Sequence, residues 1–166
     1  MKKEIRELKN GIVQITIADT ERWYQKGDKF VPSVTWICNS YPKGVPFYKW
    51  LADKGWDEAE AIKSAAGDKG SKVHHAIEDL LKGKKIAMDA KYRNPSTEEL
   101  EELSLVEYEC LMAFTRWFDS VKPKVKANEI VVFNSKDNYA GTIDLICEID
   151  KQLWLIDFKT GQNVWP

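Results

Sequence analysis

The sequence predicts an α/β (α+β) fold in which helices flank a mixed central sheet, with a small N-terminal β unit. Two observations favour this class. Strand-like segments lie near both ends of the chain, and the stretch between them carries helical periodicity and helix-capping residues. At 166 residues, with 43% hydrophobic and 31% charged residues, the chain suits one domain with a sizeable core. We therefore expect a single domain over residues 1–166.

Composition argues against several classes of protein. No apolar run approaches the roughly 20 residues that span a bilayer, and the charged N-terminus lacks the apolar centre of a signal peptide, so we expect a cytoplasmic protein with no membrane partner. Cys38, Cys110 and Cys147 fit neither a disulfide framework nor a zinc motif, which predicts buried free thiols. The net charge of −1 argues against nucleic-acid binding through bulk charge. Lysines at 82–85 and 122–126 could contact phosphates or form a solvated face.

The N-terminal third is expected to contain a strand, a hairpin and a short helix. Residues 12–17 alternate in polarity as a half-buried strand does. Residues 22–31 predict a hairpin, because Lys-Gly-Asp-Lys at 26–29 is a turn sequence between two strand-like segments. Ser33 can cap a helix over residues 34–39.

Helices are expected to dominate the middle of the chain. Residues 47–54 predict a short helix, and a second segment over residues 58–64 should end before the glycines at 67 and 70. Helical periodicity resumes over residues 71–81. After a loop over residues 84–94, a helix is expected to begin at about residues 95–99 and to run to about residue 121.

The C-terminal part predicts a strand at residues 129–133, a turn at 134–138 and a hairpin. Its two strands, 143–149 and 153–159, flank the polar break Asp150-Lys151. A two-residue loop pairs residue 149 with 152, and therefore residue 144 with 157.

This register has a chemical consequence. It places Asp144 opposite Asp157, with Cβ atoms about 4.5–5.5 Å apart, and puts Lys159 on the same face. The opposite face, which includes Cys147 and Trp154, is apolar and is expected to be core. Opposed carboxylates repel unless a proton or a divalent cation lies between them.

The constellation suggests metal-assisted hydrolysis of a phosphodiester. Two carboxylates with water and substrate phosphate suit Mg²⁺, and Lys159 could hold the attacking water or stabilise charge on phosphorus. The alternative is an Asp–Lys ion pair on an exposed hairpin.

Three further positions bear on the site. His74 could point inward near Glu78 and serve as an imidazole ligand, which would shift the metal preference of the site toward Mn²⁺. Alternatively, it could be a half-buried histidine that is hydrogen-bonded to the backbone. Glu129 matters only if its strand lies beside the strand of Asp144, and Gly141 allows a bulge or a close ligand.

These residues resemble motifs of a nuclease superfamily. Gly-Thr-Ile-Asp at 141–144, followed by Asp-Phe-Lys at 157–159, looks like the GxxD…DxK signature of PD-(D/E)XK nucleases. Gly-Ser-Lys-Val-His at 70–74, with Glu78, resembles the G-x-x-V-H-x-x-x-E element of the RecB-like exonuclease branch. Pro-Ser-Val-Thr at 32–35 is similar to the segment that often precedes this element in phage exonucleases and in mitochondrial genome maintenance exonucleases.

The resemblance implies a restriction-endonuclease-like core and one nuclease domain that lacks the C-terminal helix of the family. It implies Mg²⁺ or Mn²⁺ as cofactor, Lys159 as the residue that positions the nucleophilic water, and Glu129 as an accessory acid. The implied metal ligands are His74, Asp144, Asp157 and the backbone carbonyl of Phe158.

The implied activity is a metal-dependent deoxyribonuclease, an exonuclease acting on DNA ends or single strands. Its location would be the host cytoplasm if a phage encodes it. Three cysteines cannot supply the four ligands of the iron–sulfur members, so no cluster is expected. Trp36, Tyr41 and Trp50 could stack on unpaired bases or pack in the core. The alternatives are a non-catalytic nucleic-acid-binding module that keeps the fold and a hydrolase of another phosphodiester.

Overall fold

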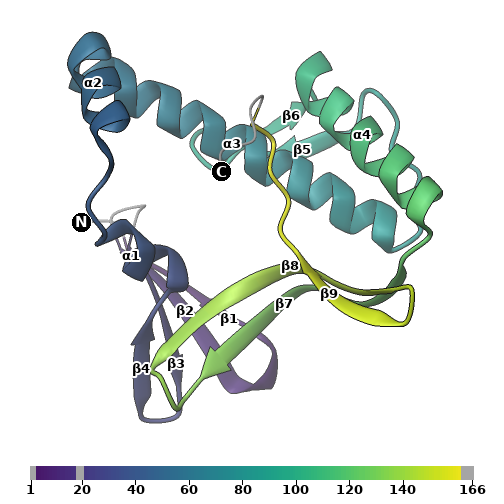
Figure 1. Cartoon of the computed structure of the whole chain (residues 1–166), viewed down its shortest axis with the longest axis horizontal. Coiled ribbons are helices and arrows are strands. Elements are labelled where there is room, and N and C mark those ends of the chain that lie inside the picture. Colours follow the sequence, from purple (N-terminus) through teal and green to yellow (C-terminus); the bar gives the residue numbers. More distant parts are fainter. Residues whose placement is uncertain (1–2, 18–20, 162–166) are drawn as a thin grey trace. The chain divides into compact units, whose positions relative to one another are not determined.

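The computed structural model describes residues 3–17 and 21–161 and shows a mixed α+β chain (Figure 1). Its strands form three sheets, ordered β1-β2-β3-β4, β5-β6 and β7-β8-β9. The α+β class is thus confirmed, and the expectation of one mixed central sheet stays a prediction. Strand contact in parallel orientation is confined, among the described pairings, to a bridge between Ser33 and Ala140.

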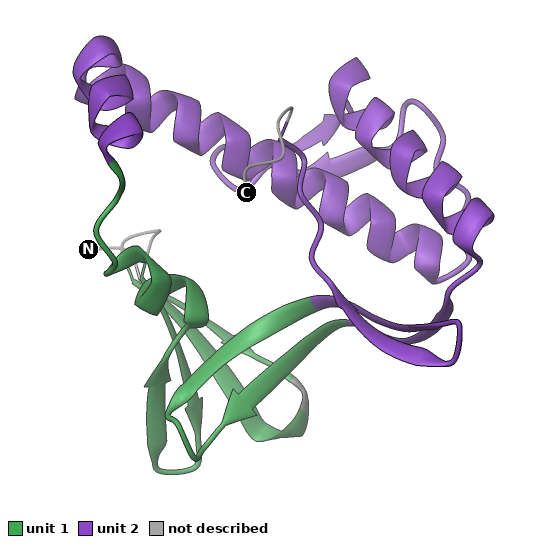
Figure 2. Ribbon diagram, viewed as in Figure 1, with its two compact units in different colours: residues 1–44, 129–143 green, residues 45–128, 144–166 purple. Residues whose placement is uncertain are grey.

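By contacts within the chain, the structure divides into two compact units (Figure 2). Unit 1 comprises residues 1–44 and 129–143, and unit 2 comprises residues 45–128 and 144–166. The chain runs from unit 1 to unit 2 and back, so each unit is built from two separate stretches. The expectation of a single domain stays a prediction.

Unit 1 contains an antiparallel sheet whose strands follow in chain order. The strand at residues 12–17 and the turn at 26–29 are both confirmed, with Lys26 paired to Lys29, whereas the first strand was not anticipated. Tyr24 and Val31 are almost fully buried and pack with Ile12 and Ala140. The strands are β1 (Lys3–Glu7), β2 (Ile12–Ile17), β3 (Glu21–Lys26) and β4 (Lys29–Pro32), with a short 3-10 turn at Lys9–Gly11.

Helix α1 (Val34–Asn39) begins where the sequence predicts. The hydroxyl of Ser33 accepts the backbone N–H of Trp36 at 3.0 Å, which satisfies one of the free N–H groups of the first turn. Gly141 lies close to α1, because a Cβ at this glycine would lie 3.4 Å from Val34 Cγ2.

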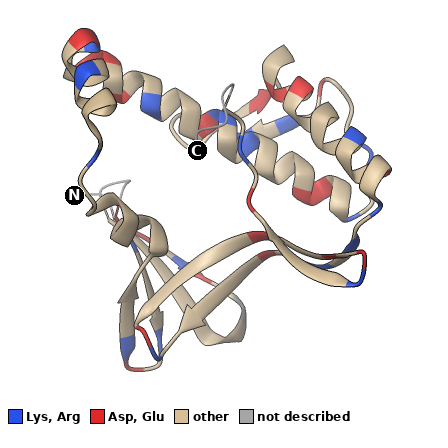
Figure 3. Ribbon diagram, in the orientation of Figure 1, with Lys and Arg blue, Asp and Glu red and all other residues tan. Residues whose placement is uncertain are grey.

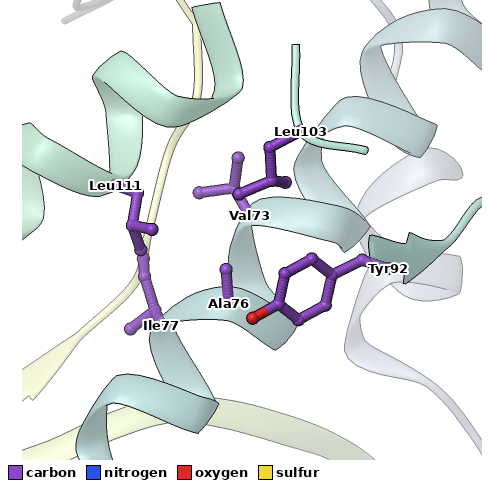
Figure 4. Packing of buried hydrophobic residues seen from close by; sticks show 6 residues of the cluster. All are labelled: Val73, Ala76, Ile77, Tyr92, Leu103 and Leu111. Carbon is purple, nitrogen blue, oxygen red and sulfur yellow. The ribbon is translucent and has the colours of Figure 1, made fainter. Parts of the chain in front are cut away.

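Unit 2 is organised around one long helix. Helix α2 (Val45–Lys54) ends at Gly55, and α3 runs without a break from Trp56 to Leu81. The predicted interruption at Gly67 and Gly70 is wrong. Each glycine costs a helix about 1 kcal/mol, and the buried stripe of Val73, Ala76 and Ile77 (Figure 4) holds the C-terminal half against the core of unit 2.

The helix predicted to begin at residues 95–99 begins instead at Leu105, as α4 (Leu105–Val121). Asn94 explains the error. Its side-chain oxygen accepts the backbone N–H groups of Ser96 and Thr97 at 2.9 and 3.3 Å, which favours a turn over a helix. The segment instead forms a two-stranded sheet of β5 (Lys91–Arg93) and β6 (Leu100–Glu102).

A capping box fixes the start of α4. Ser104 accepts from the N–H of Glu107, and the Glu107 carboxylate accepts from the N–H of Ser104 at 2.7 Å. We expect Ser104→Ala to lower the free energy of unfolding by about 1 kcal/mol, measured by urea denaturation. Ser120→Ala, at an exposed position near the other end of α4, is the matched control and should change it little. Equal effects of the two substitutions would contradict the role of the cap.

Charges are interspersed over both units (Figure 3). The lysine clusters are partly neutralised, since Lys84 pairs with Asp79 at 2.8 Å and Lys126 with Glu148 at 2.8 Å. Cys147 is buried, and burial raises the pKa of its thiol. Cys38 is exposed and Cys110 half-buried, so the prediction of three buried thiols holds for Cys147 alone. Among the helices of the described residues, none combines the length and apolar character needed to cross a membrane.

The last sheet consists of β7 (Lys124–Asn134), β8 (Tyr139–Ile149) and β9 (Gln152–Ile156). Strands β7 and β8 begin and end in different units, so the sheet contributes residues to both. Strand β7 is much longer than the predicted 129–133, and it includes Glu129.

Candidate metal centre

The predicted hairpin register is confirmed along β8 and β9. Ile149 pairs with Gln152, and Leu145 pairs with Ile156. Asp150 and Lys151 have φ angles of 50° and 65°, as a type I′ turn requires of its two central residues. The register extrapolates to Asp144 opposite residue 157, but β9 ends at Ile156.

After Ile156 the backbone no longer pairs with β8, and the Asp144 side chain accepts a hydrogen bond from the backbone that follows β9. Asp144 Oδ2 accepts the backbone N–H of Phe158 at 2.7 Å. This carboxylate is 12% exposed. A carboxylate therefore closes the open end of the hairpin, where a further ladder bond would otherwise be expected.

Asp157 and Lys159 form an ion pair with each other. Lys159 Nζ lies 2.5 Å from Asp157 Oδ2, and the side chains of Lys159 and Asp157 are 80% and 57% exposed. An exposed ion pair is the alternative that the sequence left open. The expected site, in which Asp144 and Asp157 share a cation with Lys159 beside them, stays a prediction.

The apolar face of the hairpin is core over only part of its length. Leu145 and Cys147 are fully buried, whereas Trp154 is 49% exposed. Phe158 returns to the interior, where its ring contacts Phe114 with centroids 5.3 Å apart.

His74 connects helix α3 to this segment. Its Nε2 lies 3.1 Å from the backbone oxygen of Phe158, and its Nδ1 lies 3.7 Å from Asp144 Oδ1. The expected neighbour Glu78 turns instead to Lys82, at 2.6 Å. His74, Asp144 and Phe158 all belong to unit 2 and contact one another.

The carbonyl of Phe158 fixes the tautomer of His74. A carbonyl oxygen only accepts, so Nε2 must carry the proton, and in the neutral imidazole Nδ1 then carries a lone pair. That lone pair faces Asp144 Oδ1 at 3.7 Å, which is too long for a hydrogen bond. A backbone acceptor that fixes the proton on one ring nitrogen is the usual support of a metal-binding histidine.

Glu129 lies on β7 and belongs to unit 1. Glu129 has a φ of 47° in the middle of a strand, a left-handed conformation that favours glycine. Such residues mark bulges, which redirect a side chain and are frequent beside functional sites. The condition set from the sequence, that the strand of Glu129 lie beside that of Asp144, is met, since β7 and β8 are neighbours.

A short strap holds the segment after β9 against α3. Thr160 accepts a hydrogen bond from Lys69 Nζ through its backbone oxygen at 2.9 Å, and its hydroxyl lies 3.7 Å from where a Cβ on Gly70 would be. Residues 70 and 74 are one turn apart on α3 and share a face. Lys69 is thus a positioning residue that motif reading missed, because its contact is to backbone and leaves no sequence signal.

The donor set suits a divalent cation. Within unit 2, one imidazole nitrogen and one carboxylate lie side by side, and oxygen-rich sites with an imidazole favour Mn²⁺ or Mg²⁺ over softer metals. At metal–oxygen distances of about 2.0–2.1 Å, octahedral ligands lie about 3 Å apart when adjacent and about 4.2 Å when opposite. The 3.7 Å between Nδ1 and Oδ1 falls between these values, so only small side-chain adjustments would be needed.

Unit 2 also contains a cavity of about 420 Å³ beside this site. Its walls come from α3 and α4 and from residues 156–161, and Phe158 lines it as well as contacting His74. Trp117 supplies an aromatic surface, and Asp157 and Lys159 are the charged lining residues.

Comparisons of the chain with protein-family models, with curated proteins and with solved structures find no match. The resemblance to PD-(D/E)XK nucleases therefore rests on the motifs of the chain itself.

Proposed function

We propose that the chain is a Mg²⁺- or Mn²⁺-dependent deoxyribonuclease of the PD-(D/E)XK type with a restriction-endonuclease-like core. The observation that carries the proposal is the approach of His74 Nδ1 to Asp144 Oδ1 at 3.7 Å within unit 2. The two residues come from the two motifs that carry the family resemblance, and they are 70 residues apart in the sequence.

The residues have separate tasks in the proposed reaction. His74 and Asp144 would hold the cation, and Glu129 would be the accessory acid that the resemblance implies. The cation would supply charge stabilisation on the phosphate and a more acidic water. The Phe158 carbonyl keeps the proton of His74 on Nε2, so that Nδ1 carries the lone pair of the neutral ring. Lys159, after separation from Asp157, would orient the attacking water.

The role proposed for Lys159 requires a local rearrangement. Its ion pair with Asp157 is exposed, and such pairs contribute at most about 1 kcal/mol. An incoming phosphodiester could therefore displace it at little cost. The same movement would free Asp157 to act as the further ligand that the resemblance implies.

DNA with free ends or single strands is the proposed substrate. Unpaired bases expose their faces, and stacking on an aromatic ring contributes about 1–3 kcal/mol per base. The cavity lined by Trp117 is of a size that takes small ligands, and it adjoins Phe158 of the site. Tyr41 is 72% exposed and so is accessible to a base, whereas Trp36 and Trp50 are half-buried.

A cleavage assay tests the proposal. The full chain is incubated with end-labelled single-stranded and double-stranded DNA in Mg²⁺, in Mn²⁺ and in EDTA. We expect shortening of the labelled strand with either metal and none in EDTA, and loss of cleavage in Lys159→Ala. Lys151→Ala, an exposed lysine in the turn before β9, is the matched control and should cleave as the unmodified chain does.

The other outcomes are informative. Binding of Mn²⁺ and DNA without cleavage would favour the non-catalytic nucleic-acid-binding module. Cleavage of a small phosphodiester but not of DNA would favour another hydrolase. Cleavage that survives Lys159→Ala would contradict the role given to this lysine.

A further inference from the structure

Strand β9 is exposed to an unusual degree for its composition. In the described part of the chain it forms an edge of its sheet, next to β8 alone. Leu153, Trp154 and Leu155 follow one another and are 72%, 49% and 65% exposed. Natural edge strands are usually protected by charges, proline or a bulge. β9 (Gln152–Ile156) contains no charged residue and no proline.

The hairpin geometry shows which backbone groups β9 offers at this edge. In a two-residue hairpin, the residues that flank the turn form a hydrogen-bonded pair, here Ile149 and Gln152. Backbone groups of alternate residues then point to opposite sides of the strand. Residues 152, 154 and 156 bond toward β8, and Leu153 and Leu155 point their N–H and C=O groups away from it.

The sequence of this edge is complementary to itself. If a second β9 pairs antiparallel about Trp154, then Leu153 meets Leu155 of the second copy in a hydrogen-bonded pair, and Trp154 meets Trp154 in a non-hydrogen-bonded pair. Opposite residues in such a ribbon share a face. The leucines of both copies therefore gather on one face and the two tryptophans on the other.

The charges that flank the strand agree with the same register. Lys151, directly before β9, falls opposite Asp157 of the second copy, and this match occurs at both ends because the arrangement is two-fold symmetric. Both residues are exposed. The competing partner of Asp157 is Lys159, in an exposed and therefore weak pair.

We propose that β9 is an association surface at which two copies of this chain pair antiparallel, edge to edge, about Trp154. The inference does not depend on the proposed nuclease activity. One five-residue strand buries less than a stable interface needs. The dimer should therefore be weak and reversible, with a dissociation constant in the micromolar range or above, and would be populated only at high protein concentration.

Charge reversal tests the pairing. Sedimentation velocity over about two orders of magnitude in concentration should show a monomer–dimer equilibrium. Lys151→Glu places two acids opposite each other, so we expect its dissociation constant to rise about tenfold. The double variant Lys151→Glu with Asp157→Lys exchanges the charges and should restore the dimer. Lys136→Glu, an exposed lysine in the β7–β8 turn, is the matched control and should not change it.

Disulfide trapping tests the register. In a Cys38→Ser background, which removes the exposed native thiol, Trp154→Cys should cross-link to itself, because the two positions meet at the symmetry axis. Gln152→Cys should not, since residue 152 falls opposite Ile156 of the second copy. A chain that stays monomeric at every concentration, or equal cross-linking by the two cysteine variants, would overturn the proposal.

Discussion

An Asp144→Asn variant is expected to bind Mn²⁺ at least about 100-fold more weakly than the unmodified chain and to lose DNA cleavage. Asparagine keeps a side-chain oxygen that can accept the N–H of Phe158, so the contact that closes the hairpin is retained. What disappears is the negative charge and the second oxygen, which faces His74 Nδ1 at 3.7 Å. The change therefore separates metal binding from folding.

Isothermal titration with Mn²⁺ measures the first effect, and the cleavage assay measures the second. Asp150→Asn is the control of equal charge change, because Asp150 is exposed in the turn with a φ of 50°, a conformation that asparagine tolerates. Unfolding by urea should give nearly the same free energy for both variants. Unchanged Mn²⁺ binding by Asp144→Asn would exclude this site as the metal centre.

Two acids are candidates for the second carboxylate of the site. The resemblance implies Asp157 as a metal ligand and Glu129 as an accessory acid. The same titration on Glu129→Gln and Asp157→Asn compares them directly. A larger loss of Mn²⁺ affinity in Asp157→Asn would support the ligand set that the resemblance implies, and a larger loss in Glu129→Gln would give the place of the second carboxylate to Glu129.

How far the sequence predicts this site depends on what holds each residue. The polar pair Asp150-Lys151 between two apolar runs predicts the hairpin register, and the pairing of β8 with β9 confirms it. The register alone does not predict where the side chain of Asp157 lies. Strand β9 ends at Ile156, one residue before Asp157, and the Asp144 carboxylate accepts the backbone N–H of Phe158. A side chain that replaces a ladder bond leaves no trace in hydrophobic periodicity.

The backbone conformation at Glu129 and the length of α3 also could not be predicted from the sequence. Glu129 has a left-handed φ within a strand, and no pattern of residue types in the sequence predicts this backbone conformation. Conversely, the glycines at 67 and 70 signalled a break that α3 does not have, because tertiary packing outweighs a local preference of about 1 kcal/mol per residue.

The largest expected effect on stability concerns a charge inside unit 2. Lys72 is buried on α3 and pairs with Glu107 at 3.1 Å and with Glu101 at 3.1 Å. We expect Lys72→Met to lower the free energy of unfolding by about 3 kcal/mol. Methionine fills a similar volume, but it leaves the Glu107 carboxylate, whose side chain is 5% exposed, without its cation.

The matched control is Lys63→Met on the same helix. Lys63 pairs with Glu60 at 3.3 Å, and the two side chains are 63% and 46% exposed. Exposed pairs of this kind contribute at most about 1 kcal/mol. Urea denaturation at neutral pH should therefore show a much larger loss of unfolding free energy for Lys72→Met than for Lys63→Met. Equal losses would mean that burial does not determine how much the removal of the lysine destabilises the chain.

The dependence on pH follows from the same residues. Burial lowers the pKa of Lys72, but hydrogen bonds and charge pairing with Glu107 and Glu101 outweigh it, so the pKa lies above its usual value of 10.5. A raised pKa in the folded state means that the stabilisation is complete below the unfolded pKa and is lost as pH rises through the folded one. Burial, and then the nearby charge of Asp79, raises the pKa of Tyr92. The stabilisation from Tyr92 is therefore also lost as pH rises through its pKa in the folded state. The unmodified chain should thus lose stability at strongly alkaline pH, and Lys72→Met should lose less there, because the lysine contribution is already absent.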